Sequence, residues 1–122
     1  MTQEFHSART FTLWHYTAAH GDRLLLRAKA EADKPRIDLH VEGVRGFMLT
    51  PIHRGLTIRR ATAGERQRVE AEFGVDVDEA ATVHVIGARR MRGFVVGGPL
   101  RWHEDNGDFR DPSHFGPIPG TP

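Results

Sequence analysis

Short runs in which apolar and polar residues alternate make up much of this chain of 122 residues. The clearest of them, IDLHVE at positions 37–42, puts three aliphatic side chains on one side of an extended strand and three polar side chains on the other. Alternation of this kind is typical of an antiparallel sheet that buries one face and leaves the other in water. It constrains the chain to a fold built from paired strands.

Other runs of the same kind predict further strands, at 10–17, 23–29, 47–49, 56–60, 82–86, 93–96 and 100–103. The early connections between them are too short for parallel crossovers, which favours antiparallel pairing. A single helix is predicted near 62–73, because Thr62 and Glu65 have the spacing of a capping box and Gly74 can end the helix. We therefore predict a β-dominated α+β fold, a strongly bent antiparallel sheet or partly open barrel of about eight short strands with that one helix.

The length fits one hydrophobic core, and the composition divides the chain into three parts. We predict a flexible N-terminus at 1–9, a single β-rich domain at 10–108 and an extended tail rich in Pro and Gly at 109–122. Basic residues exceed acidic ones in 45–101, whereas acidic residues exceed basic ones in 102–122. This contrast favours a tail that folds back on the domain.

Composition also excludes several classes of chemistry. The chain has no cysteine, which rules out disulfides, thiolate nucleophiles and cysteine-ligated metal centres. It has no run near the ~20 apolar residues that cross a bilayer and no secretory pattern at its start, so we expect a cytoplasmic protein with no membrane partner. Nearly all basic residues are arginine, which suits a GC-rich bacterial genome. No motif calls for a cofactor, and we expect none.

The predicted strand at 10–17 carries large apolar groups on both sides, which needs an explanation. Strict alternation would put Trp14 and Tyr16 together on the face opposite the core. Exposed Trp and Tyr side chains often mark a binding surface, because each joins a large apolar ring to a polar group. We interpret Trp14 and Tyr16, with Trp102, as candidate binding residues and as a candidate homodimer contact. The alternative is that the sheet bends or the tail covers this face.

Histidine and carboxylate side chains offer a different hypothesis, an active site. Four histidines of the predicted strands are the candidate catalytic residues: His15, His40, His84 and His103. If their strands converge on a pocket, the imidazoles could exchange protons with a substrate. Asp38, His40 and Glu42 share one side of a strand and are candidate metal ligands. The same trio is also the ordinary solvent face of a half-buried strand, and we favour that interpretation.

The absence of a compact catalytic motif favours a binding protein over an enzyme. We expect a small bacterial-type binding or protein-interaction module, accessory or immunity-like, that acts through a sheet face. The alternative is a small barrel-like enzyme with histidines and carboxylates in a central pocket. A protein or a second copy of the chain is the expected partner, with a small ligand as the other option. Arg90 and Arg92 in ARRMRG could bind phosphate, but without interleaved aromatic residues we expect no nucleic-acid partner.

Overall fold

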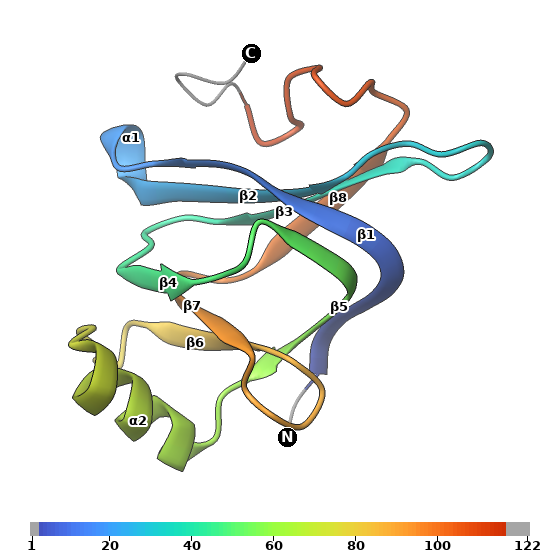
Figure 1. Cartoon of the computed structure of the whole chain (residues 1–122). Coiled ribbons are helices and arrows are strands. Elements are labelled where there is room, and N and C mark those ends of the chain that lie inside the picture. The colour runs from blue at the N-terminus through green and yellow to red at the C-terminus, as the bar shows by residue number, and fades with distance from the viewer. Residues whose placement is uncertain (1–2, 117–122) are drawn as a thin grey trace.

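The computed structural model describes residues 3–116 and shows one antiparallel sheet that curves strongly on itself without closing (Figure 1). The sheet has eight strands in the order β4-β7-β6-β5-β1-β2-β3-β8. Their bounds are β1 (Gln3–Thr17), β2 (Arg23–Ala28), β3 (Arg36–Val41), β4 (Gly46–Met48), β5 (Ile52–Arg60), β6 (Thr82–Ile86), β7 (Gly93–Gly97) and β8 (Arg101–Asp105). The predicted fold class is confirmed, including the antiparallel pairing of neighbouring strands.

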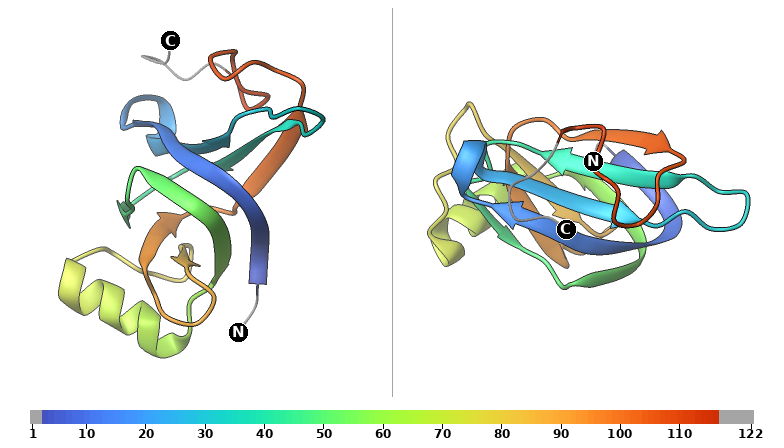
Figure 2. Two further views of the ribbon diagram at one scale, coloured as in Figure 1. Left: turned by 45° about the vertical axis from the view of Figure 1, so that its right-hand side comes forward. Right: turned by 90° about the horizontal axis from the view of Figure 1, so that it is seen from above.

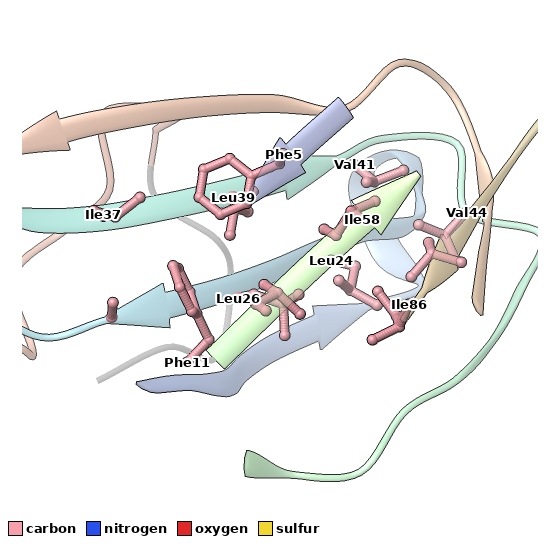
Figure 3. Close-up of a cluster of buried hydrophobic side chains, with 13 residues drawn as sticks. Phe5, Phe11, Leu24, Leu26, Ile37, Leu39, Val41, Val44, Ile58 and Ile86 are labelled. Carbon is pink, nitrogen blue, oxygen red and sulfur yellow. The ribbon is translucent and has the colours of Figure 1, made fainter. Parts of the chain in front are cut away.

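The main hydrophobic core fills the inside of the curve, and we call the side of the sheet that faces it the inner face (Figure 3). Its buried side chains are Phe5, Phe11, Leu24, Leu26, Ala28, Ile37, Leu39, Val41, Val44, Leu56, Ile58, Ile86 and Val95. Most of these residues occupy alternate positions of their strands, as the sequence pattern predicts. The positions between them form the outer face of the sheet.

A second, smaller cluster lies on the outer face of β6 and β7, under the helix α2 (Ala63–Phe73). Thr62 and Glu65 form the predicted capping box, and Gly74 ends the helix with a φ of 67°. The helix buries Val69 against the two strands. A four-residue turn of helix, α1 (Ala19–Asp22), connects β1 to β2. Within the described part of the chain, no helix is long and apolar enough to cross a membrane.

β1 has 15 residues, and its ladders with both neighbouring strands are interrupted. The register shifts at 3–5 and 7–10 against β5, and at 13–15 against β2. Each shift inserts an extra residue into β1, which bends the strand and increases its twist. β1 therefore curls around the core, as the long blue ribbon in Figure 2 shows.

The two ends of the chain differ from the predicted boundaries. β1 begins at Gln3, so residues 3–9, expected as a flexible N-terminus, include a stretch that pairs with β5. Residues 106–116, which we call the C-terminal segment, fold back over the outer face of β2 and β3 (Figure 2). They contact Arg27 and Arg36 from the first third of the chain, and the ring of Phe115 lies 6.0 Å from the guanidinium of Arg101, in the basic stretch at 45–101. Residues 1–2 and the end of the predicted tail, 117–122, lie outside the described residues.

Candidate functional site

The predicted binding face is divided, because Trp14 and Tyr16 do not share a side of the sheet. The register shift in β1 makes Trp14 an extra residue, and beyond it Tyr16 lies opposite the core residue Leu24. Tyr16 therefore belongs to the inner face, where its ring centroid lies 5.0 Å from that of Phe47. The prediction of a shared face is wrong, because strict alternation assumes an uninterrupted ladder.

Trp14 is covered, whereas Trp102 remains accessible. The Trp14 ring packs edge-on against Phe109 of the C-terminal segment with 4.4 Å between ring centroids, and the Arg27 guanidinium lies 5.5 Å from its centre. Trp102, on the edge strand β8, is 48% exposed and packs against Phe5. The aromatic residues predicted to bind a partner thus occupy separate places in the molecule.

Three of the predicted catalytic histidines share the outer face. His40 stacks on Phe115 and His103 stacks on His114, so the C-terminal segment covers both. His15 lies in the same cross-strand row as His40. The rings of His40 and His103 therefore face a segment of the chain itself and not an open cavity.

His40 is fully buried, with its ring held by the sheet. Arg23 Nε donates a hydrogen bond to His40 Nε2 at 3.1 Å, so the ring proton is on Nδ1. Nδ1 finds no hydrogen-bond partner in the part of the chain that the structure describes. Burial, and after it the charge of Arg23, lowers the pKa of His40 to about 4. The ring is neutral near pH 7.

His84, the fourth, is buried on the inner face, opposite the core residue Val95. Its Nδ1 lies 2.7 Å from Glu4 Oε2, and its Nε2 lies 2.7 Å from the carbonyl oxygen of Gly98. Both ring nitrogens are therefore engaged. These contacts join the start of β1 to β6 and to the turn after β7, on the opposite side of the sheet from the other three histidines.

The candidate metal ligands are divided among separate contacts. Both carboxylate oxygens of Asp38 accept hydrogen bonds from Arg27, at 2.7 and 2.9 Å, in a buried ion pair. Glu42 lies at the surface, 3.3 Å from Arg101. Among residues 3–116, no group of three or more His, Asp or Glu side chains is arranged to hold a metal ion.

A pocket of about 850 Å³ lies where the first part of β1, β5 and the β6–β7 loop meet. In Figure 1 this loop lies beside the end of β5 and the start of β1. The described residues that line the pocket include Arg54, Arg90, Arg92, His6 and His53, and none of them carries a carboxylate. We call it the cationic pocket. Its volume is within the range of about 300–1,000 Å³ that is typical of small-molecule sites.

The three arginines of the cationic pocket are exposed and unpaired. Among the described residues, none of their guanidinium groups forms a hydrogen bond or an ion pair. Each guanidinium group offers a planar fork of donors that matches the geometry of carboxylate and phosphate oxygens. A concave surface lined by one sign of charge attracts counterions of the opposite sign.

A buried arginine positions the loop that carries two of these side chains. Arg59 donates to the carbonyl oxygens of Gly87 at 3.1 Å and Arg89 at 2.8 Å, and it pairs with Glu65 through two hydrogen bonds. Hydrogen bonding to Arg59 lowers the pKa of Glu65 to about 2. Gly87 has a φ of 122°, and a Cβ there would lie 2.2 Å from the Arg90 carbonyl oxygen. The loop is therefore held in one conformation, with glycine required at its start.

The rest of the lining is neutral and partly apolar. His6 Nδ1 lies 2.7 Å from Thr57 Oγ1. Burial lowers the pKa of His53, so this ring is neutral near pH 7. Ile52 and Met91 add apolar surface. A ligand that combines negative charge with an apolar part would match this lining.

The sequence alone indicated part of this site. ARRMRG was identified as a candidate phosphate-binding stretch, but the meeting of its arginines with Arg54 depends on long-range pairing that no local spacing reveals. Comparisons with protein-family models, with curated proteins and with solved structures found no match.

Proposed function

We propose that this protein is a binding module for a small anionic ligand, a phosphate-bearing molecule with an apolar portion, which it holds in the cationic pocket. The observation that carries the proposal is the convergence of Arg54, Arg90 and Arg92 on one pocket, where the part of the chain that the structure describes supplies neither a partner for their guanidinium groups nor a carboxylate. Phosphate oxygens match the fork of guanidinium donors, and each such hydrogen bond is strengthened by charge on both partners.

The preformed loop supports binding with little reorganisation. Arg59 and Gly87 fix the β6–β7 loop before any ligand arrives, so the arginines lose less conformational freedom on binding. The enzyme alternative has one feature in its favour, the His6–Thr57 contact inside the pocket. No third group among the described residues orients that pair, so we favour binding without turnover.

The proposal is tested by ligand-dependent thermal unfolding of the full chain. Pyrophosphate, ribose 5-phosphate and AMP are compared with adenosine at constant ionic strength. A ligand at about 100 times its Kd stabilises the folded state by about 2.7 kcal/mol. We expect the phosphate compounds to raise the melting temperature and adenosine to leave it unchanged. ³¹P NMR of the bound ligand detects turnover, which would favour the enzyme alternative instead.

The chain offers a matched control for the site. Arg89 lies on the same loop between Ala88 and Arg90 but does not line the pocket. We expect the double variant R90Q/R92Q to lose the stabilisation by phosphate compounds and R89Q to keep it. Equal protection of all three proteins, or no protection of the wild type by any phosphate compound, would overturn the proposal.

A further inference from the structure

The outer face of β2 and β3 carries charged groups that a bare sheet would leave in water. Arg27 and Arg36 are nevertheless only 1% and 2% exposed, because the C-terminal segment lies across them (Figure 2). We call this surface the docking face and define it by Arg23, Arg27, Arg36, His40 and Trp14.

Arg27 shows how the docking face is built. Its Nε and Nη2 bind the carboxylate of Asp38 on the neighbouring strand, which fixes the guanidinium within the sheet. Its Nη1 is left to donate to the carbonyl oxygens of Phe109 and Asp111 in the C-terminal segment. The sheet thus orients the donor, and the segment supplies only backbone acceptors.

Arg36 repeats this arrangement. Its Nε and Nη2 bind Asp105, both at 2.8 Å, while Nη1 donates to the carbonyl oxygens of Asp108 and Asp111 at 2.8 and 2.9 Å. Nη2 also donates to the carbonyl of Pro112 at 3.1 Å. Hydrogen bonds from preoriented donors to main-chain carbonyls are a means by which a protein can bind a peptide segment.

Two phenylalanines anchor the segment at its ends. Phe109 packs on Trp14, as described above, and Phe115 stacks on His40 with 4.7 Å between ring centroids. Arg23, whose Nε is held by His40, donates from Nη2 to the carbonyl oxygen of Phe115. The segment is therefore bound by the rings of Phe109, His114 and Phe115 and by several of its backbone carbonyls.

The segment is separable from the core in structural terms. Within residues 3–116 it forms no strand ladder with the sheet, and the main core lies on the inner face, on the other side of β2 and β3. Lifting the segment would expose arginines, carboxylates, histidines and one tryptophan, while the core residues of those strands would stay covered.

We propose that the docking face is a peptide-binding site that can take the C-terminal segment of a second copy of this chain in place of its own. The ligand is a peptide with two phenylalanines that forms turns at 108–111 and 113–116, as the segment itself does. The same contacts form within one chain or between two, so exchange requires only that the connection at Asn106 and Gly107 straighten. The cationic pocket plays no part in this proposal.

The test uses a full-length variant whose own segment cannot anchor. F109S/F115S is made in a W102F background, so that Trp14 is the remaining tryptophan. The peptide NGDFRDPSHFG, identical to residues 106–116, is added, and Trp14 fluorescence and calorimetry report binding. The control peptide, NGDSRDPSHSG, lacks both rings. We expect saturable 1:1 binding of the first peptide, no binding of the second, and no binding of either to the W102F parent, whose docking face is occupied.

Two results would overturn the peptide-binding site. The first is that F109S/F115S, with native far-UV circular dichroism, shows no saturable binding of the peptide up to about 1 mM. That concentration is the scale of effective concentration set by a short linker. The other is loss of the folded state in F109S/F115S, because separability is part of the claim. Exchange between copies is tested by concentrating the wild type at mildly acidic pH, returning it to pH 7 and measuring mass by light scattering. We expect a dimer for the wild type and none for F109S/F115S. A wild type that stays monomeric would exclude the second copy as the occupant.

Discussion

The docking face and the cationic pocket both depend on arginine, and they use it in opposite ways. On the docking face, Arg27 and Arg36 are buried, and their donors are bound to carboxylates of the sheet and carbonyls of the C-terminal segment. In the pocket, Arg54, Arg90 and Arg92 are exposed and have no partner among the described residues. The same side chain therefore stabilises the fold where it is paired, whereas in the pocket it is the basis of the ligand binding that we propose.

The largest expected effect comes from breaking the buried pair of Arg27 and Asp38. R27A leaves a carboxylate without its partner in a site from which water is excluded, which costs about 3–5 kcal/mol. The matched control is R68A, since Arg68 pairs with Glu72 at the surface of α2, where such pairs contribute about 0–1 kcal/mol. Urea denaturation measures both. If R27A loses no more stability than R68A, the docking face does not stabilise the fold in the way described.

The same contrast explains what could be predicted from sequence. Alternation predicted the antiparallel sheet because burial of one face imposes a period of two on every strand, and the capping box at Thr62 predicted α2 because its contacts are local. The side of the sheet occupied by Trp14 and Tyr16 was not predictable, because it depends on a register shift set by pairing with β2. Paired and unpaired arginines look alike in a sequence, since their partners lie far away along the chain.

Two further predictions are right in part, because each depends also on residues far along the chain. IDLHVE predicts a strand, which is correct, with its polar side in water; that side is instead covered at His40 by a segment about 70 residues later in the chain. Charge asymmetry indicated that a tail would fold back. It did not indicate which arginines the tail would contact, because carbonyl groups, which every residue has, make most of the contacts.

The second prediction concerns pH and distinguishes the docking face from the pocket. His40 has a pKa of about 4 in the folded protein against 6.5 for an ordinary histidine, so the folded state binds fewer protons than the unfolded state. The contribution of His40 to the free energy of unfolding is therefore complete above about pH 6.5. It is lost as pH falls toward 4, by an amount on the order of 2 kcal/mol. Arg23 and Arg101 oppose protonation of this ring, while Glu42 and Asp38 favour it less strongly than burial opposes it.

The measurement is the urea midpoint of the wild type and of H40Q between pH 7 and pH 4.5. An amide at this position can still accept the hydrogen bond from Arg23 but does not titrate. We expect H40Q to be less stable at pH 7 and to lose less stability on acidification. Parallel pH dependence of the two proteins would show that another group controls the acid sensitivity.

The Glu65 carboxylate, whose pKa is about 2, affects stability at lower pH than His40 does. Its contribution to the free energy of unfolding is complete above about pH 4.5 and is lost as pH falls toward 2.

The third prediction concerns the conformation of the β6–β7 loop. G87A places a Cβ against the Arg90 carbonyl oxygen at a φ that residues with a side chain rarely adopt, which costs about 1–3 kcal/mol. The control is G43A, since Gly43 also has positive φ but no atom near the position of its Cβ. We expect G87A to destabilise the protein more than G43A and to weaken phosphate binding, whereas G43A should leave binding unchanged. Equal binding by both variants would show that the loop conformation does not set the geometry of the pocket.

The smallest expected change in stability is that of R90Q/R92Q. It is also the most direct test of the difference between the arginines of the docking face and those of the cationic pocket. These guanidinium groups have no partner to lose within residues 3–116, so their removal should change the free energy of unfolding by no more than about 0.5 kcal/mol, as for other surface substitutions. At low salt we expect R90Q/R92Q to have a slightly higher free energy of unfolding than the wild type, because three positive charges that converge on one pocket repel each other. This gain should vanish as added salt screens the charges. R89Q, outside the pocket, should show less of this salt dependence. A loss above about 1 kcal/mol in R90Q/R92Q would mean that these arginines are structural like Arg27.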